Sequence, residues 1–455
     1  MKQYKKSIFW FRQDLRTYDN TWLIEAIKKS EEILPIFILD THIIGKFWWL
    51  KDQKFWFIRE ALEHVSSDIQ KLWGEKVIVL TWKPEDIIPQ LVKKYNIDCI
   101  FTNTTYGSYG KKRDILVSEN SDCNFETFKD FLLAEPHEVG TRKVFTPFYK
   151  LWQKLDFETT EQTCPKILQL PTEEQTEASD FIEKIQHPYF TMDFWEKRFA
   201  MLPIKNYNDI RNDLDVDGTS RLSPYLRFGI FSIRQIFNKH TLHWAIPEKW
   251  APWEHYISEL AWREFWWHIY YNFPHTKTLE FQEKRRYIEW SQDTEIFKKW
   301  CNWETGYPIV DAAMKQLNET NWMHGRARMV VASFLTKDLN IDWRLWEGYF
   351  REKLLDYDEW VNLWNWQWGA SVWADPKPLR IFSPLLQSEK FDTEGKYIHH
   401  YIPELKFVPL KHIHNPIANS LDYCELLVDH SKAQAKTKEI YKQSSIDFEA
   451  QKNSN

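Results

Sequence analysis

A short hydroxyl-rich segment, residues 218–223 (GTSRLS), combines groups that bind phosphate. Thr219, Ser220 and Ser223 supply hydroxyls and Arg221 supplies a guanidinium, just ahead of a helical pattern. Hydroxyls, a guanidinium and backbone N–H groups at a helix start suit a phosphate or pyrophosphate. An ordinary helix N-cap produces such a segment more often than a ligand site does, so the segment alone decides nothing.

Other polar residues recur in aromatic surroundings further along the chain. Glu259, Trp262 and Arg263 are spaced three and four residues apart, so they share one face of a predicted helix.

A pair of acids forms the next group. Asp356 and Asp358 flank Tyr357, and Asn362 follows Asp358 by four residues. Two acids this close can hold a cationic edge, share a proton or cap a helix, and Arg328 is a natural counter-ion for one of them. A structural ion pair is an equally good interpretation of such a pair.

The elements that must position these residues fall into two classes. The first hundred residues alternate short apolar runs with stretches of helical period. The runs are 7–11, 33–39, 76–81 and 98–102, and the helical stretches are 21–29, 53–72 and 84–95. This alternation predicts a parallel sheet covered by helices, an α/β doubly wound N-terminal domain.

After about residue 190 the strand signals almost vanish. Helical patterns dominate, as at 253–271, 309–317 and 326–339, and predict an all-α C-terminal domain. Polar, acidic residues at 155–190 are typical of a connector, and the last thirty residues are polar and expected to fray. The predicted boundaries are 1–130, a linker at 131–195, 196–435 and a polar tail at 436–455.

Composition excludes several classes of protein. Hydrophobic residues make up 43% and charged residues 27% of the chain, and no apolar run approaches the length of a membrane span. The five cysteines are far apart with no CxxC, so we expect no disulfide framework, zinc site or iron–sulfur cluster. The start shows no pattern of a signal peptide, and we expect a cytoplasmic protein without a metal.

These segments together resemble the DNA photolyase/cryptochrome family, most of all its bacterial class I cyclobutane pyrimidine dimer photolyases. The resemblance runs from about residue 7 to 435, with motifs in the order and spacing of the family. They lie at 10–16 (WFRQDLR), 218–223, 262–265 (WREF), 305–314 (TGYPIVDAAM), 322–324 (WMH), 332–335 (ASFL), 342–344 (DWR), 365–368 (NWQW) and 380–384 (RIFSP).

The resemblance implies an antenna domain followed by a helical domain that holds FAD in a U-shape. Arg328 and Asp356 would pair beside the isoalloxazine ring, Asp358 would accept hydrogen bonds from the flavin or ribityl edge, and Asn362 would face flavin N5. The full set of implied FAD-binding residues is Tyr207, Thr219, Ser220, Arg221, Leu222, Ser223, Arg328, Asp356, Tyr357, Asp358 and Asn362.

The activity implied is light-driven DNA repair. Excited reduced FAD gives one electron to a cyclobutane pyrimidine dimer flipped out of DNA, the ring splits, and the electron returns. Glu259 matches the acid that bonds the pyrimidine edge, and Trp262 and Trp368 match the rings that stack on the dimer. The implied DNA or lesion contacts are Arg211, Glu259, Trp262, Arg263, Gly325, Arg326, Met329, Trp368 and Gln387.

Three tryptophans match the family's chain that photoreduces oxidised FAD from the surface. They are Trp366, Trp343 and Trp290. With Glu259 and Asn362 they complete the implied catalytic set, and the implied partner is DNA with UV-induced dimers, bound by a monomer.

The sequence departs from the family at two places. Gly325 stands where most cyclobutane-specific members have Asn, which puts one lesion contact in doubt. Around residues 106–114 there is no Glu where folate-binding members use one. A second antenna chromophore is therefore left unspecified: a deazaflavin, another flavin or an empty cleft.

The tryptophan and glycine counts are abnormal. There are 26 tryptophans and only 12 glycines. Eight tryptophans fall where the family has Gly or where a turn favours it: Trp48, Trp49, Trp73, Trp82, Trp303, Trp346, Trp364 and Trp373. We hypothesise that the source organism reads the UGA codon as Gly and that these positions were translated as Trp. UGG codons at Trp303, Trp346, Trp364 and Trp373 would contradict this.

Two alternatives to cyclobutane-dimer repair stay open. A blue-light sensor of cryptochrome type would bind FAD and repair nothing. A (6-4) photolyase would use a histidine-centred site, but His324 precedes the Gly325 position rather than replacing it.

Overall fold

The computed structural model describes residues 2–44, 53–155, 187–200, 206–241, 254–373, 379–417 and 423–454. Its contacts group the chain into two compact units. The first unit comprises Met1–Gly140, Tyr149–Leu202 and Ser220–Glu264, and the second comprises Thr141–Phe148, Pro203–Thr219 and Phe265–Asn455. We call them the α/β unit and the helical unit.

The α/β unit is built on a five-stranded parallel sheet with strand order β3-β2-β1-β4-β5. The strands are β1 (Tyr4–Phe11), β2 (Ser30–Asp40), β3 (Ile78–Trp82), β4 (Cys99–Asn103) and β5 (Asn124–Phe128). The predicted doubly wound fold is confirmed. The sequence missed β5, an edge strand whose five residues are all exposed or half-buried.

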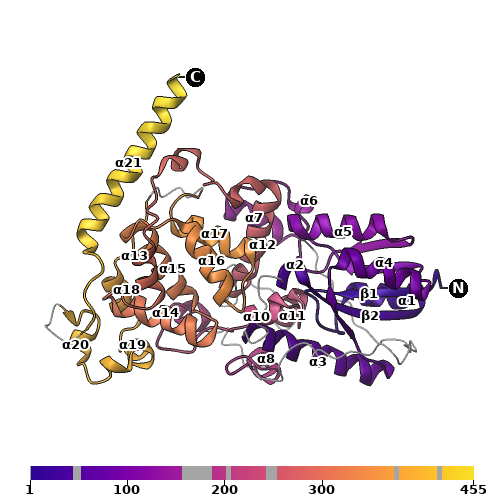
Figure 1. The fold of residues 1–455 in the computed structure, drawn as a ribbon. Coiled ribbons are helices and arrows are strands. Elements are labelled where there is room, and N and C mark those ends of the chain that lie inside the picture. The colour runs from indigo at the N-terminus through magenta and orange to yellow at the C-terminus, as the bar shows by residue number, and fades with distance from the viewer. Residues whose placement is uncertain are drawn as a thin grey trace. The chain divides into compact units, whose positions relative to one another are not determined.

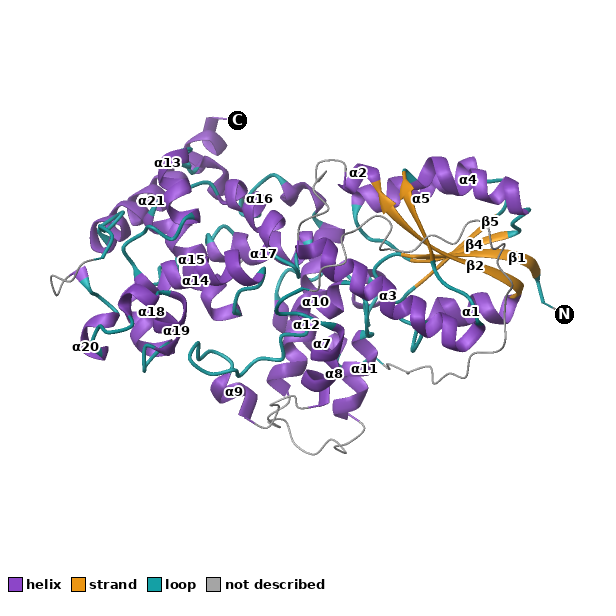
Figure 2. Cartoon of the chain, turned by 60° about the horizontal axis from the view of Figure 1, so that its bottom comes forward, coloured by secondary structure: helices purple, strands orange, loops and turns teal. Residues whose placement is uncertain are grey.

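Helices cover both faces of this sheet. They are α1 (Thr21–Lys29), α2 (Thr41–Ile44), α3 (Gln53–Trp73), α4 (Pro84–Tyr95), α5 (Ser108–Asn120) and α6 (Pro136–Val139). Figure 2 shows α4 and α5 on one face and α1 and α3 on the other. Trp10, Ile36 and Ile100 belong to the buried core between the strands and α4.

Three shorter helices of the α/β unit, and the start of a long one, come from later in the chain. They are α8 (Met192–Ala200), α10 (Ser223–Arg227), α11 (Ile233–Thr241) and the first part of α12 (Glu254–Asn272). Most of the predicted acidic connector, residues 156–186, lies outside the described residues.

Buried ion pairs join these later segments to the sheet. Asp130 accepts from Arg16 at 2.5 Å and from Arg234 at 2.7 Å, and Arg234 also donates to Asp19 at 3.0 Å. Burial acts to raise the pKa of Asp130, but the charges of Arg16 and Arg234 outweigh it and hold that pKa below its usual value.

The helical unit contains no strand among its described residues, as the sequence predicts. Its helices are the first part of α7 (Phe145–Trp152), the later part of α12, α9 (Tyr207–Ile210), α13 (Thr294–Cys301), α14 (Pro308–Thr320), α15 (Gly325–Ser333), α16 (Trp343–Lys353), α17 (Glu359–Gly369), α18 (Pro384–Phe391), α19 (Lys396–Tyr401), α20 (Leu410–Ile413) and α21 (His430–Ser454). Shorter 3-10 turns are η4 (Pro274–Lys277), η5 (Glu283–Tyr287) and η7 (Pro403–Leu405), and η6 (Phe334–Asp338) is a π-helical turn.

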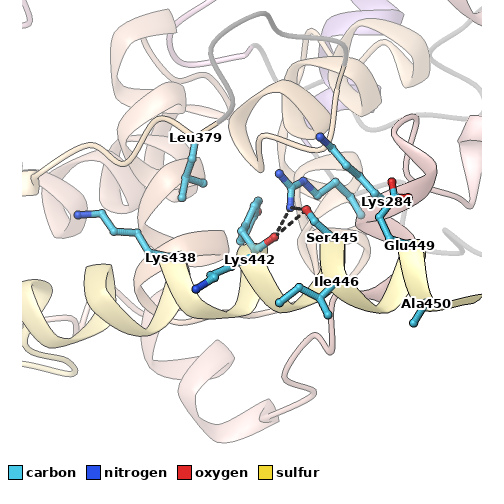
Figure 3. A pocket seen from close by; sticks show the side chains of 10 residues that line it. Lys284, Leu379, Lys438, Lys442, Ser445, Ile446, Glu449 and Ala450 are labelled. Carbon is cyan, nitrogen blue, oxygen red and sulfur yellow. Dashed lines mark hydrogen bonds between the residues drawn. The ribbon is translucent and has the colours of Figure 1, made fainter.

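The expected frayed tail is instead the helix α21, the long yellow helix of Figure 1. Its buried residues, Ala433, Thr437, Tyr441 and Ser444, form one stripe that packs against η5 and η6. Arg285 of η5 donates to the Tyr441 carbonyl and to Ser444 Oγ in this stripe. Arg285 also donates to Ser445 Oγ at 3.3 Å, and both residues line the pocket shown in Figure 3. The prediction was wrong because these buried side chains are small or polar and give no apolar signal.

Candidate functional site

The predicted phosphate segment has a backbone that only certain residues tolerate. A Cβ on Gly218 would lie 2.7 Å from the carbonyl oxygen of Ile210, so the close approach of α9 requires glycine there. Arg221 has a φ of 52°, in the left-handed region. Strained backbone of this kind gathers at ligand sites. The helix that follows, α10, is only five residues long, so its dipole adds little.

Arg328 and Asp356 form the expected ion pair in the helical unit. Arg328 Nη2 donates to both carboxylate oxygens of Asp356, at 3.0 and 2.8 Å, and its Nε donates to the Met323 carbonyl at 2.9 Å. The Asp356 side chain is buried, whereas Arg328 keeps some exposure. A fixed guanidinium of this kind can face an electron-rich ring edge.

Asp358 acts as the N-cap of α17. Its Oδ1 accepts from the backbone N–H groups of Trp360 and Val361, and its Oδ2 accepts from Trp267 Nε1 at 3.1 Å. Both oxygens therefore already have partners. This supports the capping interpretation over a direct bond to a flavin edge.

Tyr357 turns its hydroxyl toward other residues of the protein. The hydroxyl bonds Glu347 and accepts from Arg351 Nε at 3.2 Å. These contacts favour a structural role for the phenol, and the predicted role of Tyr357 in cofactor binding stays a prediction.

Asn362 is the most informative residue of the set. It lies on α17 with a buried side chain, and its Oδ1 accepts from Trp366 Nε1 at 3.0 Å. That bond fixes which way the amide points, and it leaves Nδ2 buried with no hydrogen-bond partner among the described residues. A buried donor without a partner costs about 1–3 kcal/mol. A ligand that offers an acceptor, such as a ring nitrogen, would remove this cost.

The remaining tryptophans of the predicted chain occupy different depths. Trp343 begins α16 and is 1% exposed, while Trp290 follows η5 and is half-buried. Both indole N–H groups donate to one carboxylate, that of Glu280, a residue that no sequence motif marks.

The predicted lesion acid lies in the α/β unit, close to the phosphate segment. Glu259 is exposed and Trp262 half-buried on α12. One turn earlier, Tyr256 hydrogen-bonds Ser220, and burial raises the pKa of Tyr256 to about 12. The structure therefore brings Glu259 and part of residues 218–223 together in one unit.

Arg263, on the same helix, has a structural partner. It donates to the Phe131 carbonyl at 3.1 Å, and its guanidinium lies 4.0 Å from the centroid of the Phe131 ring. This contact favours a structural role over the predicted DNA contact.

The two predicted phosphate-binding arginines of the helical unit are held near each other. Arg326 donates to Asn212 Oδ1 at 2.7 Å and stacks on Phe391. Burial lowers the pKa of Arg326, and the charge of Arg211 lowers it further. Like charges placed this close are typical of an anion site. The sequence missed Asn212, whose only signal is its place next to Arg211.

The other predicted lesion contacts are spread over three helices. Trp368 on α17 is half-buried under Arg380, whose guanidinium lies 5.5 Å from its ring. Gly325 opens α15 and is exposed, and a Cβ there would meet no atom within 4 Å, so the position has room for a side chain. Met329 and Gln387 are half-buried, and Gln387 Oε1 has no described hydrogen-bond partner.

A cluster of polar side chains lies at the ends of two neighbouring strands of the sheet. Asp14 and Asn103, which follow and end neighbouring strands, hydrogen-bond each other, and Arg12 donates to Asp114 at 2.8 Å. Burial raises the pKa of Asp14 to about 6. The strand order reverses between β1 and β4 here, which is the usual ligand position in such sheets.

Comparison with known proteins identifies the family. Residues 256–452 match the FAD binding domain of DNA photolyase, and residues 7–167 match the DNA photolyase domain. A deoxyribodipyrimidine photo-lyase of Alkalihalophilus pseudofirmus is 35% identical and aligns over 95% of this chain and 97% of its own length. The chain belongs to the DNA photolyase family. The enzyme of the same name from Escherichia coli is 32% identical, over 95% of this chain and 98% of its own.

Solved structures of the family have the same fold. A Sulfolobus tokodaii photolyase with two FAD molecules has a TM-score of 0.86 at 30% identity and covers 96% of this chain and 100% of its own. A cryptochrome from Synechocystis also has a TM-score of 0.86, at 25% identity, over 97% of this chain and 100% of its own.

The residues present fit the cofactor of this family, FAD. The buried Nδ2 of Asn362 needs an acceptor, the Arg328–Asp356 pair offers a fixed charge, and the strained segment around Arg221 suits phosphates.

Among the described helices, none combines the length and apolarity that crossing a membrane requires.

Proposed function

We propose that this protein is a deoxyribodipyrimidine photo-lyase that binds FAD and uses light to split cyclobutane pyrimidine dimers in DNA. The observation that carries the proposal is the buried amide of Asn362, which Trp366 fixes in one orientation and which lacks a partner for Nδ2. The named relatives that align along nearly the whole chain support it.

FAD, when bound in its reduced state, supplies the light-excited electron that the dimer needs to open. The chain's own residues hold it. Residues 219–223 would bind the phosphates, Arg328 and Asp356 would border the ring, and Asn362 Nδ2 would donate to it. Because Arg328 is fixed by Asp356 and by the Met323 carbonyl, its charge needs little reorganisation on binding.

The lesion would be held by stacking and by one acid. Trp262 and Trp368 would each offer a flat apolar face to the flipped dimer. Glu259 would hydrogen-bond the pyrimidine edge and steady the charge that develops on it during ring opening. Arg380 stacks on Trp368 and would hold that ring in place.

The DNA backbone would meet Arg211 and Arg326. Burial and, to a smaller extent, the charge of Arg211 lower the pKa of Arg326, and a phosphate between the two arginines would offset both effects. Asn212 fixes Arg326 by two bonds to one oxygen, so the guanidinium is already oriented for a phosphate.

We also propose a second chromophore at the edge of the sheet near Asp14 and Asn103, where the strand order reverses. The photolyase of Sulfolobus tokodaii, which contains two FAD molecules, supports a flavin there over an empty cleft. We propose further that the protein acts as a monomer in the cytoplasm.

The competing function is light sensing without repair, which the likeness to a cryptochrome supports. Lesion binding separates the two. Reconstituted with FAD, the protein should retain flavin and bind a duplex with one cyclobutane dimer far more tightly than the undamaged duplex. Retained flavin with equal binding to both duplexes would favour the sensor, and failure to take up flavin would contradict both.

A further inference from the structure

A buried carboxylate with no part in the proposed repair reaction joins two of the predicted chain tryptophans. Glu280 Oε1 accepts from Trp290 Nε1 at 3.0 Å and from Trp343 Nε1 at 3.2 Å. The Glu280 side chain is only 4% exposed. Because both bonds end on one oxygen, the two indole nitrogens can be no farther apart than these two bonds laid end to end. The carboxylate is therefore shared by rings that are far apart in the sequence.

Arg344 completes this cluster. Its Nη2 donates to the same Glu280 oxygen at 2.9 Å, and its Nη1 donates to Asp342 at 3.0 Å. Its guanidinium lies over the Trp343 ring, 4.5 Å from the centroid. A cation over an indole face is attracted by its electrons, so it makes removal of an electron from Trp343 harder.

The carboxylate acts in the opposite sense. A negative charge that accepts the indole N–H bond stabilises a positive charge on that ring, and the effect is large in a site of low dielectric. Trp343 donates to the Glu280 carboxylate and also has the Arg344 guanidinium against its ring face, so the two effects oppose each other on this ring. A positive charge is therefore favoured on Trp290, where Glu280 also accepts the N–H bond.

We propose that Glu280 is the proton acceptor of the outer tryptophans, and that it draws the positive charge outward from Trp343 to Trp290. The proposal rests on the proposed role of Trp366, Trp343 and Trp290 as an electron-supply chain.

In the proposed step, Trp290 loses one electron and one proton and later regains both. After Trp343 has given one electron to Trp366, Trp290 gives one electron to Trp343 and becomes a radical cation. The Nε1–H bond of Trp290 breaks, and its proton forms an O–H bond with Glu280 Oε1, leaving a neutral indolyl radical and a neutral carboxyl group. A thiolate from solution then gives one electron to Trp290 and becomes a thiyl radical, and the proton returns to Nε1.

The test uses two variants that remove the same charge from the same segment. Glu280→Gln keeps the size and an acceptor oxygen but removes the charge and the proton acceptor. Glu283→Gln is the matched control, because Glu283 lies three residues away on η5 with an exposed side chain. Should Glu280→Gln fail to fold, Glu280→Asp keeps the charge beside Arg344 but shortens the reach to the indoles.

Two measurements are made on each protein. In flavin-free protein, indole ¹H–¹⁵N spectra, assigned with Trp290→Phe and Trp343→Phe, report the hydrogen bonds directly. In FAD-loaded protein, laser-flash absorption follows the tryptophan radical cation and its conversion to the neutral radical. We expect Glu280→Gln to shift both indole signals and to lengthen the lifetime of the radical cation about tenfold, the equivalent of one pKa unit. Glu283→Gln should match the parent.

The outcomes separate this proposal from the function on which it rests. Radical kinetics in the folded Glu280 variant equal to those of Glu283→Gln would overturn the role of Glu280 while leaving the electron chain intact. Photoreduction of the parent that Trp290→Phe does not change would overturn the chain itself, and the role of Glu280 with it. Neither result bears on repair by chemically reduced protein.

Discussion

Glu259 is the single side chain on which the repair chemistry depends most directly. It is an exposed acid on α12, near the Ser220 segment through Tyr256. Glu259→Gln keeps the shape and one hydrogen bond but removes the charge and the proton. We expect the repair yield per absorbed photon to fall about tenfold while binding to dimer-containing DNA changes much less, because the interaction matters in the reacting state.

The matched control for this prediction is Glu254→Gln, which removes the same charge from the first turn of the same helix. Its yield should equal that of the parent. Equal yields for the parent and Glu259→Gln would remove the role assigned to Glu259.

Trp366 is the second residue with a separable role. Trp366→Phe keeps most of the packing against Phe350, but phenylalanine is much harder to oxidise and gives no N–H to Asn362. We expect light-driven reduction of oxidised FAD to become at least about tenfold slower, with repair by chemically reduced protein largely kept. Trp300→Phe, a buried change outside the chain, serves as the control. Photoreduction at the parent rate in Trp366→Phe would show that electrons enter by another route.

In the turn after α13, the tryptophan at position 303 does not suit the backbone conformation. Trp303 has a φ of 54°, a left-handed conformation in which a Cβ is strained, and its side chain is 37% exposed. We expect Trp303→Gly to raise the free energy of unfolding by about 1 kcal/mol. Trp303→Ala removes the ring but keeps the Cβ, so it should give no such gain. Urea unfolding compares the two, and a glycine variant no more stable than the alanine variant would refute the strain.

Two other questioned tryptophans pack on each other. Trp364 is fully buried, and its ring lies 4.6 Å from that of Trp373. Its Nε1 is buried with no described hydrogen-bond partner, a state that it shares with Trp22 and Trp56. Of the other questioned positions, Trp48 and Trp49 and the side chain of Trp346 lie outside the described residues. The codon hypothesis is still a proposal that the coding DNA can decide.

The attachment of α21 should depend on pH. His430, at the start of α21, bonds Asp338 of η6, and this bond raises the pKa of His430 above its usual value. A raised pKa means that the protonated form stabilises the fold below about pH 6.5, and that this contribution is lost as pH rises through the folded-state pKa. Because His430 is only half-buried, we expect a loss of about 1 kcal/mol or less.

Hydrogen exchange of the α21 amides measures this loss. Protection relative to the rest of the helical unit should fall as pH rises above about 6.5 in the parent, and should stay level in His430→Gln. A parallel fall in both proteins would show that another group controls the helix.

How far the sequence predicts an element depends on what that element buries. The strands β1, β2 and β4 and the helices α1, α3 and α4 bury continuous or periodic apolar residues and were predicted, although β1 and β2 begin three residues before the apolar runs that marked them. The strand β5 and the helix α21 bury little or bury small polar side chains, so no hydrophobic pattern marks them. The spacing of Ala433, Thr437, Tyr441 and Ser444 was the one signal for α21.

The site shows the same division. The residue types predict that Arg328 pairs with one of the two acids, and the resemblance to the family indicated Asp356, which the structure confirms. The bonds from Trp290 and Trp343 to Glu280 could not be predicted, since nothing local in the sequence connects the three residues. Contacts of this kind depend on how η5 and α16 pack, which only the folded chain reveals.

On the scale of the whole molecule, both units agree with one family. The α/β unit has the parallel sheet, the FAD-binding domain match at residues 256–452 lies mostly in the helical unit, and relatives align over nearly all of the chain. Two properties are not determined by membership of the family. One is the lesion, because Gly325 departs from the family at a lesion contact. The other is the range of wavelengths that the protein absorbs, because the second chromophore is unspecified.

The most direct test of the central claim is light-dependent repair of a single defined lesion. Purified protein with chemically reduced FAD is mixed with an oligonucleotide that contains one cyclobutane thymine dimer, and the restored thymines are counted per absorbed photon. A matched oligonucleotide with a (6-4) lesion and a dark sample run in parallel. We predict repair of the cyclobutane dimer in light only, with the (6-4) lesion untouched. No repair of either lesion by flavin-loaded, reduced protein would contradict the account and favour a light sensor, and repair of the (6-4) lesion alone would contradict the assigned substrate.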